Sequence, residues 1–575
     1  MVLGQLCHVA IYNDDMYRVS SSPLSFSLTH DTHPLTHPLT HTLTHTHLLA
    51  VGHNRYWSSN SPYAKQNGGD FAFSDWTTPK DYIVPLEQRF WDFLLGKSKK
   101  WGLAVYEQDW LYNEFNGVPM LTRNATMART WLMQMGEAAR KNGLTIQYCM
   151  AYPRHALQSV EIPAVTQIRA SDDYVPGTRG TPHNWNIGGS SIFAHALALA
   201  PFKDNFWTNA SEPGGSCGNA VEPGVVLHSA VSTLSAGPVT PSDGIGFSNV
   251  ELIMRSCRAD GTLLQPSRPT TYTDAYIHGM ASGQWLASGH VWSSYTEIPD
   301  TSDGGEARRW DLIFSHELTR PFAVTPDILT LDREVSQRDA SITRVAYALD
   351  TNTLDVASLQ VQAFDAKHPF TTSPTTDPDN GFEIWHVAEV LAGSDWVLLG
   401  ELSKWVPVAA NRVESVQVAN GQLTTVIVGS AGEEVVLYFA DATDAIVSTG
   451  VMTGKNYSFH ANAYCDDHKG DGNHVHAYVS DTDSLQQCKA VCDDMDACTC
   501  FDYNDKVSPN AQEKLYKCRV DNITTGVTHS STGYSAYQPI IPPPPPPPQL
   551  STKSIKCTIG SDGKATARMP AGTCS

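Results

Sequence analysis

Residues able to perform acid–base or nucleophilic chemistry follow three apolar runs of the chain. Asp109 ends the run "LAVYEQD", and Cys149 lies near the end of "LTIQYCMAY". The adjacent carboxylates Asp172 and Asp173 come directly after "VTQIRAS", in which Arg169 precedes Asp173 by four residues. Short apolar runs rich in β-branched and aromatic residues are typical of buried strands. We therefore expect these polar side chains to lie at the ends of strands.

Two carboxylates brought together from different strands suit glycoside hydrolysis. One attacks the anomeric carbon while the other, as the acid, protonates the leaving oxygen. Asp172 beside Asp173 supplies a like charge, which favours keeping a proton on one of the two carboxyl groups. Arg169 has the opposite effect on any carboxylate with which it pairs, so we expect it to hold the nucleophile or a substrate hydroxyl.

Other interpretations of the two adjacent aspartates stay open at this point. Aspartates after a strand are common in turns and helix caps, where their oxygens accept free backbone N–H groups. A metal site is disfavoured because no nearby histidine has ligand spacing, and His183 and His195 are expected in a loop and a helix. A serine hydrolase would need a Gly-x-Ser-x-Gly elbow, which "GSAGE" and "GGSSI" do not supply. We therefore expect no metal and no cofactor.

The segment that carries these residues alternates strand-like and helix-like patterns from residue 48 to 327, which predicts an α/β fold. Trp101–Leu111 is expected to contain a strand, and Met127, Trp131 and Met135 share one face of a helix that Gly143 ends. In a parallel (β/α)8 barrel all strand C-termini open on one face, where active sites are built. Asp173 follows Asp109 by 64 residues, about two βα units of roughly 30 residues each.

The rest of the chain divides into regions that differ in residue composition and hydrophobic pattern. Residues 328–460 contain short β-rich runs separated by Gly, Asp and Asn, which predicts an antiparallel β-sandwich. Residues 461–538 form a cysteine-rich module, and residues 539–575 a linker with seven consecutive prolines followed by a short tail. Residues 1–47 repeat Thr-His and are predicted to be low-complexity sequence without a packed core.

Composition restricts the partners and the compartment. The formal net charge of −20 argues against nucleic acid or an anionic membrane surface as a partner, and no apolar run of 18 residues predicts a membrane span. Six of the 12 cysteines fall within residues 465–518, which favours disulfides over a zinc site and indicates an oxidising compartment. We therefore expect a secreted glycoprotein, with sequons at Asn124, Asn209, Asn456 and Asn522. The first residues lack the basic and apolar regions of a signal peptide.

Four segments resemble, in the right order, a known family. "QYCMAY…VTQIRASDDYVP", "IGGSSIFAHALALAPFKDNFW", "HSAVSTLSAGPVTPSDGIGFSN" and "RADGTLLQPSRPT" are similar to the α-galactosidase, seed imbibition protein and raffinose synthase family of glycoside hydrolases. The cysteine module, in which Cys488 and Cys492 lie one helical turn apart, is similar to PAN/apple domains, a small disulfide-rich α+β fold. Members of that second family bind proteins or carbohydrates, so a protein or glycan partner is expected there.

The first resemblance implies a retaining α-glycosidase on a (β/α)8 TIM-type barrel with a C-terminal β-sandwich. Asp109 takes the place of the family nucleophile, and Asp173 that of the acid/base. Arg169, Asp172, Trp110, Cys149 and Asp204 are the expected substrate contacts.

The chain also departs from the family. Glu107 stands where the family has a lysine, and the Asp-Asp-Gly-Trp motif of the earlier strands does not occur. Only 61 residues separate Leu48 from Asp109, so either the sequence is truncated or the barrel lacks its first strands. Two functions follow as alternatives. The first is an α-galactosidase-like enzyme, which hydrolyses α-linked galactose or transfers it as raffinose synthase does. The second is a catalytically inactive, secreted carbohydrate- or protein-binding protein.

Overall fold

The computed structural model consists of two compact units, Met1–Ala445 with Leu550–Ser575, and Ile446–Gln549. In the first unit it describes residues 50–54, 57–74, 82–177, 185–213, 219–284, 288–302, 305–329, 344–365, 368–375, 377, 379–442, 550–570 and 572–574. In the second unit it describes the backbone of five strands between residues 456 and 540. The predicted low-complexity segment 1–47 lies outside the described residues.

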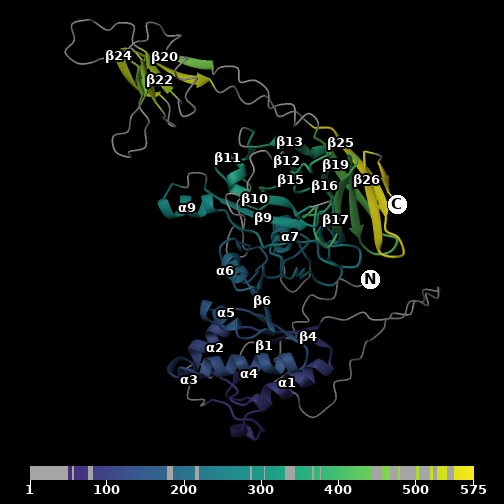
Figure 1. Ribbon diagram of the computed structural model, residues 1–575. Helices are drawn as coiled ribbons and strands as arrows, with labels where there is room; N and C mark the ends of the chain where they lie inside the picture. The colour runs from purple at the N-terminus through teal and green to yellow at the C-terminus, as the bar shows by residue number, and fades with distance from the viewer. Residues whose placement is uncertain are drawn as a thin grey trace. The chain divides into compact units, whose positions relative to one another are not determined.

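A parallel sheet of five strands, in the order β1-β4-β5-β6-β7, forms the N-terminal part of the first unit (Figure 1). The strands are β1 (Ala50–Asn54), β4 (Leu103–Gln108), β5 (Thr145–Tyr148), β6 (Val165–Arg169) and β7 (Ala200–Phe202). The helices between them are α1 (Gln88–Lys100), α2 (Leu111–Gly117), α3 (Pro119–Arg123), α4 (Met127–Lys141), α5 (Pro153–Ser159) and α6 (Ser190–Ala196). A short hairpin, β2 (Trp57–Ser58) with β3 (Tyr82–Ile83), precedes α1. The α/β prediction is thus confirmed, whereas closure into an eight-stranded barrel stays a prediction, because β1 and β7 are edges of the described sheet.

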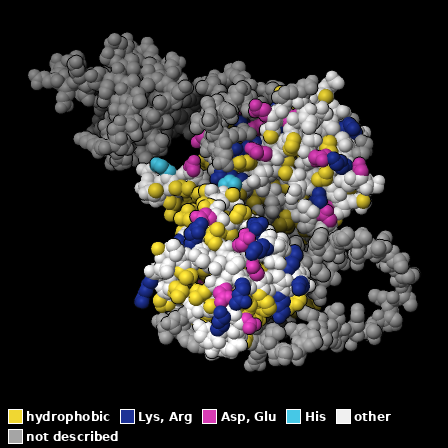
Figure 2. All heavy atoms as spheres, turned by 60° about the horizontal axis from the view of Figure 1, so that its bottom comes forward, with side chains coloured by type: hydrophobic (Ala, Val, Ile, Leu, Met, Phe, Trp, Pro, Cys, Tyr) yellow, Lys and Arg dark blue, Asp and Glu magenta, His cyan; other side chains and the backbone are white. Residues whose placement is uncertain are grey.

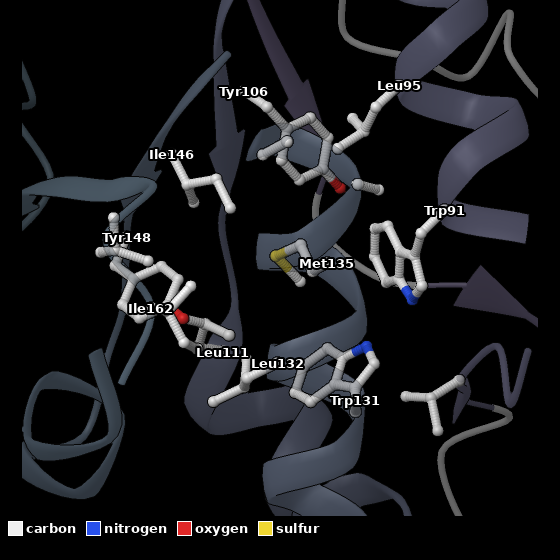
Figure 3. Packing of buried hydrophobic residues seen from close by; sticks show 14 of the residues in the cluster. Trp91, Leu95, Tyr106, Leu111, Trp131, Leu132, Met135, Ile146, Tyr148 and Ile162 are labelled. Atoms are coloured by element: carbon white, nitrogen blue, oxygen red, sulfur yellow. The ribbon is translucent and has the colours of Figure 1, made fainter. Parts of the chain in front are cut away.

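Helices α1 and α4 cover the strands with large apolar side chains. Trp91 of α1, Trp131 and Met135 of α4, Tyr106 of β4 and Ile146 of β5 all belong to one buried cluster. Figure 3 shows Met135 lying among Tyr106, Ile146 and Trp91. Each buried side chain of this size stabilises the fold by about 1.5–3 kcal/mol. The predicted apolar face of α4 is therefore the face that packs on the sheet.

The ends of α4 follow from single residues at its two termini. The Asn124 side-chain oxygen accepts the backbone N–H groups of Thr126 at 3.0 Å and Met127 at 3.2 Å, which satisfies donors that the first turn leaves free. Gly143 has φ of 60°, a left-handed conformation that favours glycine and stops the helix. The predicted helix end at Gly143 is confirmed.

Antiparallel strands form the next sheet, whose order is β13-β12-β15-β10-β9-β8. Its strands are β8 (Thr271–Tyr272), β9 (His290–Ile298), β10 (Arg308–His316), β12 (Arg344–Ala348), β13 (Gln360–Phe364) and β15 (Phe382–Glu389). A small pair, β11 (Phe322–Val324) with β14 (Phe370–Thr372), accompanies it. Strand β10 pairs with β9 on one side and β15 on the other, so one ladder joins segments from both sides of residue 328. The antiparallel region therefore begins before the predicted boundary of 328.

Two smaller sheets share one core and form a β-sandwich. Their orders are β16-β19-β25 and β17-β18-β26-β27. The strands are β16 (Trp396–Gly400), β17 (Val413–Ala419), β18 (Gln422–Val428), β19 (Glu434–Asp441), β25 (Thr552–Thr558), β26 (Lys564–Met569) and β27 (Thr573–Cys574). Residues 550–574 thus belong to the sandwich, which corrects our expectation of a linker and tail over 539–575. The correction has a physical reason: Ile555, Cys557 and Met569 are buried in the shared core, and a Cys557–Cys574 disulfide closes β25 onto β27.

The second unit is an antiparallel sheet inserted in sequence between β19 and β25. Its order is β20-β24-β22-β23-β21, from β20 (Asn456–Cys465), β21 (Ala477–Val479), β22 (Cys500–Tyr503), β23 (Cys518–Asp521) and β24 (Val527–Ile540). Cys488 and Cys492, which carry the PAN/apple resemblance, lie outside the described residues. The PAN/apple fold and its disulfides therefore stay predictions.

The face drawn in Figure 2 shows basic and acidic side chains interspersed, with hydrophobic ones gathered in patches between them. The acidic excess of the sequence therefore does not produce a field of a single sign on this face. Within the described part of the chain, no helix is long and apolar enough to cross a membrane.

The place of residues 550–574 in the sandwich predicts the effect of an Ile555→Ala substitution. Ile555 is buried in the core, so its truncation should lower the free energy of unfolding by about 2–4 kcal/mol. Neighbouring Ser554 is exposed, and Ser554→Ala should change it by less than about 0.5 kcal/mol. Chemical denaturation measures both, and equal, small effects would show that the segment is only a tail.

Candidate active site

The predicted site residues come from adjacent strand ends of the parallel sheet. Gln108 is in register with Tyr148, Tyr148 with Ile168, and Arg169 with Phe202. The next residues along the chain therefore share one edge of the sheet: Asp109 after β4, Cys149 after β5, and Lys203 and Asp204 after β7. Parallel strands bring their carboxyl ends to one edge in this way, where α/β proteins bind ligands.

Arg169, the last residue of β6, lies at the centre of this edge. Its guanidinium pairs through Nη2 with Asp173 Oδ1 at 2.5 Å and through Nη1 with Asp204 Oδ2 at 3.5 Å. The arginine side chain is only 10% exposed. Burial by itself lowers the pKa of Arg169, but electrostatic interactions with Cys149 and with the carboxylates of Asp204, Asp173 and Asp109 outweigh it and raise that pKa above its usual value. Arg169 therefore pairs with the predicted acid Asp173 and with Asp204, rather than with the predicted nucleophile, and its role as a substrate or nucleophile anchor stays a prediction.

Asp109 is held by its own backbone neighbours. It is 9% exposed, and its Oδ1 accepts the backbone N–H of Trp110 at 2.7 Å, while Gln108 Nε2 donates to its carbonyl at 2.9 Å. Trp110 has φ of 57°, a left-handed conformation that is unusual for a tryptophan. Such conformations persist where the surrounding structure enforces them and are frequent at functional sites. The carboxylate thus has a fixed position at the strand end.

Cys149 is buried beside Asp109. Burial raises the pKa of the Cys149 thiol well above its usual value, and the negative charges of Glu107 and Asp109 act in the same direction, against the effect of Arg169. The thiol is therefore protonated at neutral pH, and it hydrogen-bonds the Asp109 carboxylate. Cys149 thus steadies Asp109 as a neutral donor. Glu107 adds a further negative charge to this cluster.

The two adjacent aspartates differ in their contacts. Asp173 is 57% exposed at its side chain and forms the ion pair with Arg169, whereas Asp172 is exposed and has no ion pair with any described residue. The Ser171 hydroxyl donates to the Asp172 carbonyl at 3.0 Å and accepts the backbone N–H of Asp204 at 3.0 Å. The loop after β6 is therefore tied to the loop after β7.

Asp204 completes this connection. Besides Arg169, its Oδ2 accepts the backbone N–H of Tyr174 at 2.7 Å. Asp204 is therefore a bridge between the two loops in this structure, and contact with substrate stays a prediction.

Sequence reasoning missed a buried polar group behind Asp204. Lys203 is fully buried, and its Nζ donates to the carbonyls of Asp204 at 2.9 Å and Asn205 at 2.8 Å. Its ammonium lies 4.8 Å from the ring centroid of Tyr174, whose hydroxyl hydrogen-bonds Glu222. A lysine inside the run "APFKDNFW" was the available signal, because an ammonium in an apolar strand end needs partners.

Within the described part of the chain, no group of three or more His, Cys, Asp or Glu side chains is arranged to hold a metal ion.

Comparison with known proteins gives one sequence match. No family model matches the chain. Over 125 residues it is 30% identical to a protein of Arabidopsis thaliana named probable galactinol–sucrose galactosyltransferase 6, a stretch that covers 21% of this chain and 15% of that relative. The match therefore spans only a small part of the relative's length.

A solved structure with detectable likeness is α-galactosidase I from Mortierella vinacea. It is 14% identical, covers 59% of this chain and 76% of its own, and has a TM-score of 0.32.

The burial of Lys203 predicts a specific pH dependence of stability. Burial lowers the pKa of Lys203 to about 7, opposed by Asp204 and Glu222, whereas an unfolded lysine titrates near about 10.4. Between these values the unfolded chain holds the proton and the folded chain does not, so this group makes the free energy of unfolding rise with pH. The contribution is on the order of 1 kcal/mol per pH unit from about pH 7 to 10.

Lys203→Met should remove that rise, and Lys100→Met, at an exposed position, should keep it. Urea unfolding at several pH values measures the slope for each variant. Parallel slopes for the wild type and Lys203→Met would contradict the assignment.

Proposed function

We propose that this chain is a retaining α-glycosidase of the α-galactosidase type, which hydrolyses or transfers α-linked galactose on oligosaccharides or glycoconjugates. The observation that carries the proposal is the placement of Asp109 and Asp173 at strand ends of one sheet edge, both interacting with Arg169. Many glycosidases use two carboxyl groups that lie at the C-terminal ends of the strands of an α/β fold. The similarity to a probable galactosyltransferase supports the sugar class.

In the proposed reaction the Asp109 carboxylate attacks the anomeric carbon. The glycosidic C–O bond breaks as Asp173 gives its proton to the leaving oxygen, which leaves a glycosyl ester on Asp109. Asp173, now a carboxylate, then takes a proton from water or from a sugar hydroxyl, whose oxygen attacks the anomeric carbon and displaces Asp109. Two inversions give net retention. The Cys149 thiol, hydrogen-bonded to Asp109, keeps that carboxylate in place.

Arg169 has a further part in this proposal. An ion pair favours the charged carboxylate, whereas the acid must hold a proton before the first step. A substrate hydroxyl that takes the place of Asp173 at Nη2 would release this carboxyl from the ion pair, while Asp204 continues to neutralise the buried cation.

Substitution of Asp109 and of Asp173 tests the two proposed catalytic roles. Asp109→Asn should lower kcat on an aryl α-galactoside by about 10³-fold or more, because the covalent step is lost. Asp173→Asn should lower kcat by about 10²–10⁴-fold on substrates with poor leaving groups, the range of general acid–base catalysis, and less on an activated aryl glycoside. Asp172→Asn, at a position expected only to contact substrate, should raise KM and leave kcat within about tenfold of the wild type.

Steady-state kinetics on two leaving groups distinguishes the outcomes. A loss with Asp172→Asn and none with Asp173→Asn would transfer the acid role to Asp172. Equal background rates for the wild type and Asp109→Asn would overturn the enzyme proposal.

A second function, a catalytically inactive carbohydrate-binding protein, is favoured by one observation. Glu107 replaces a lysine of the family and adds negative charge next to Cys149 and Asp109. Binding of galactosides by the wild type without turnover would support this alternative.

The proposal extends to the setting of the protein. A secreted glycoprotein with a glycan or protein partner at residues 461–538 fits the clustered cysteines and the Cys557–Cys574 disulfide, since disulfides persist in oxidising compartments.

A further inference from the structure

Two unusual turns lie side by side next to Asp109 and Cys149. Trp110 has φ of 57° and Met150 has φ of 46°, both left-handed and both in non-glycine residues, each one position beyond a predicted site residue. The backbone N–H of Tyr112 donates to the Met150 carbonyl at 3.0 Å, which ties the turn after β4 to the turn after β5. Left-handed backbone in non-glycine residues is frequent at functional sites, and here two such turns hold the residues that follow them.

The residues that follow the two turns present a fixed aromatic pair. The rings of Tyr112 and Tyr152 lie with centroids 5.6 Å apart, and Asn116 Nδ2 donates to the Tyr152 hydroxyl at 2.7 Å. The Tyr152 ring is also stacked on His155, with centroids 6.0 Å apart and 14° between the planes. Despite these contacts Tyr152 remains 38% exposed. An aromatic ring that is held from several sides and still exposed is ready to receive a flat apolar ligand surface.

The support under Tyr152 is neutral and rigid. His155 is fully buried and its Nδ1 accepts the backbone N–H of Tyr152 at 2.9 Å. Burial lowers the pKa of His155 to about 3, with a smaller effect from Arg154, so the imidazole is uncharged at neutral pH. Phe115 packs edge-on against His155 and lies under the Arg154 guanidinium, 4.4 Å from its ring centroid. The imidazole that supports the Tyr152 ring is therefore buried and uncharged.

We propose that Tyr112 and Tyr152 form a binding platform for the sugar ring on the leaving-group side of the glycosidic bond that is cleaved. Tyr152 is three residues beyond Cys149 and Tyr112 is three beyond Asp109, so both rings follow strand ends at the sheet edge that carries the reacting carboxylate. The apolar C–H face of a pyranose ring packs on an aromatic face, and the Tyr152 hydroxyl adds a polar contact at its rim. This inference rests on the proposed function and makes the enzyme specific for oligosaccharides over simple glycosides.

Binding to the Asp109→Asn variant tests the platform without turnover. The probes are an α-1,6-linked galactosyl-glucose disaccharide and methyl α-galactoside, measured by isothermal titration calorimetry. Adding Tyr152→Ala should weaken disaccharide binding by about tenfold, the size of one aromatic contact, and leave the methyl glycoside unchanged. Tyr152→Phe should stay within about threefold, because the ring is kept. Leu157→Ala, on an exposed position of α5, is the matched control and should change neither ligand.

The outcomes separate the two proposals. If Tyr152→Ala weakens both ligands equally or neither, the platform is wrong, whatever the wild type catalyses. If the wild type has no activity but its disaccharide binding depends on Tyr152 as described, the platform stands and the catalytic proposal falls. Binding of neither sugar overturns the platform, and circular dichroism of each variant identifies a loss that comes from unfolding.

Discussion

A buried guanidinium is the constraint on which the candidate site depends. A cation removed from water is costly unless carboxylates neutralise it, and Arg169 meets this need through Asp173 and Asp204, with Asp109 and Cys149 also close enough to interact. Since those partners follow four different strands, β4 to β7, one charge requirement constrains the relative positions of four loops. Lys203 is also buried, but its amino group is satisfied by two backbone carbonyls, those of Asp204 and Asn205. These hydrogen bonds hold the loop that carries Asp204.

Hydrogen bonds from buried side chains attach the antiparallel region to the helices that follow β7. Trp405 Nε1 donates to Ser229 Oγ on α7 (Val225–Leu234) at 3.0 Å. Lys404 Nζ donates to the carbonyls of Met254 and Cys257, at the end of α8 (Val250–Met254), at 2.8 and 2.9 Å. α9 (Asp274–Ser282) begins with a Thr273 cap directly after β8. The sheet of β8–β15 and the sandwich thus support the scaffold through side chains that are distant in sequence.

Local pattern was enough to predict the strands at Asp109, Cys149 and Arg169 and the stop of α4 at Gly143, because apolar periodicity and a left-handed glycine act over a few residues. The pairing of strands that are distant in sequence could not be predicted from local pattern. The return of β25 and β26 to the sandwich depends on ladders formed across the inserted cysteine module, so the segment looked like a tail. Lys203 was missed for a related reason: its partners are carbonyls, which every residue has. The pairing of Asp173 with Arg169 was open because four-residue spacing after a strand fixes no side-chain contact.

The most direct test of the account is a search for the covalent intermediate on Asp109. An activated fluorinated galactoside that forms a glycosyl ester quickly and releases it slowly should add one sugar mass to the protein. Peptide mass spectrometry should then place that mass on the peptide containing Asp109, and the label should be absent from Asp109→Asn. A label on another carboxylate would contradict the assignment of Asp109 as the nucleophile. So would a protein that releases the leaving group of this galactoside without becoming labelled.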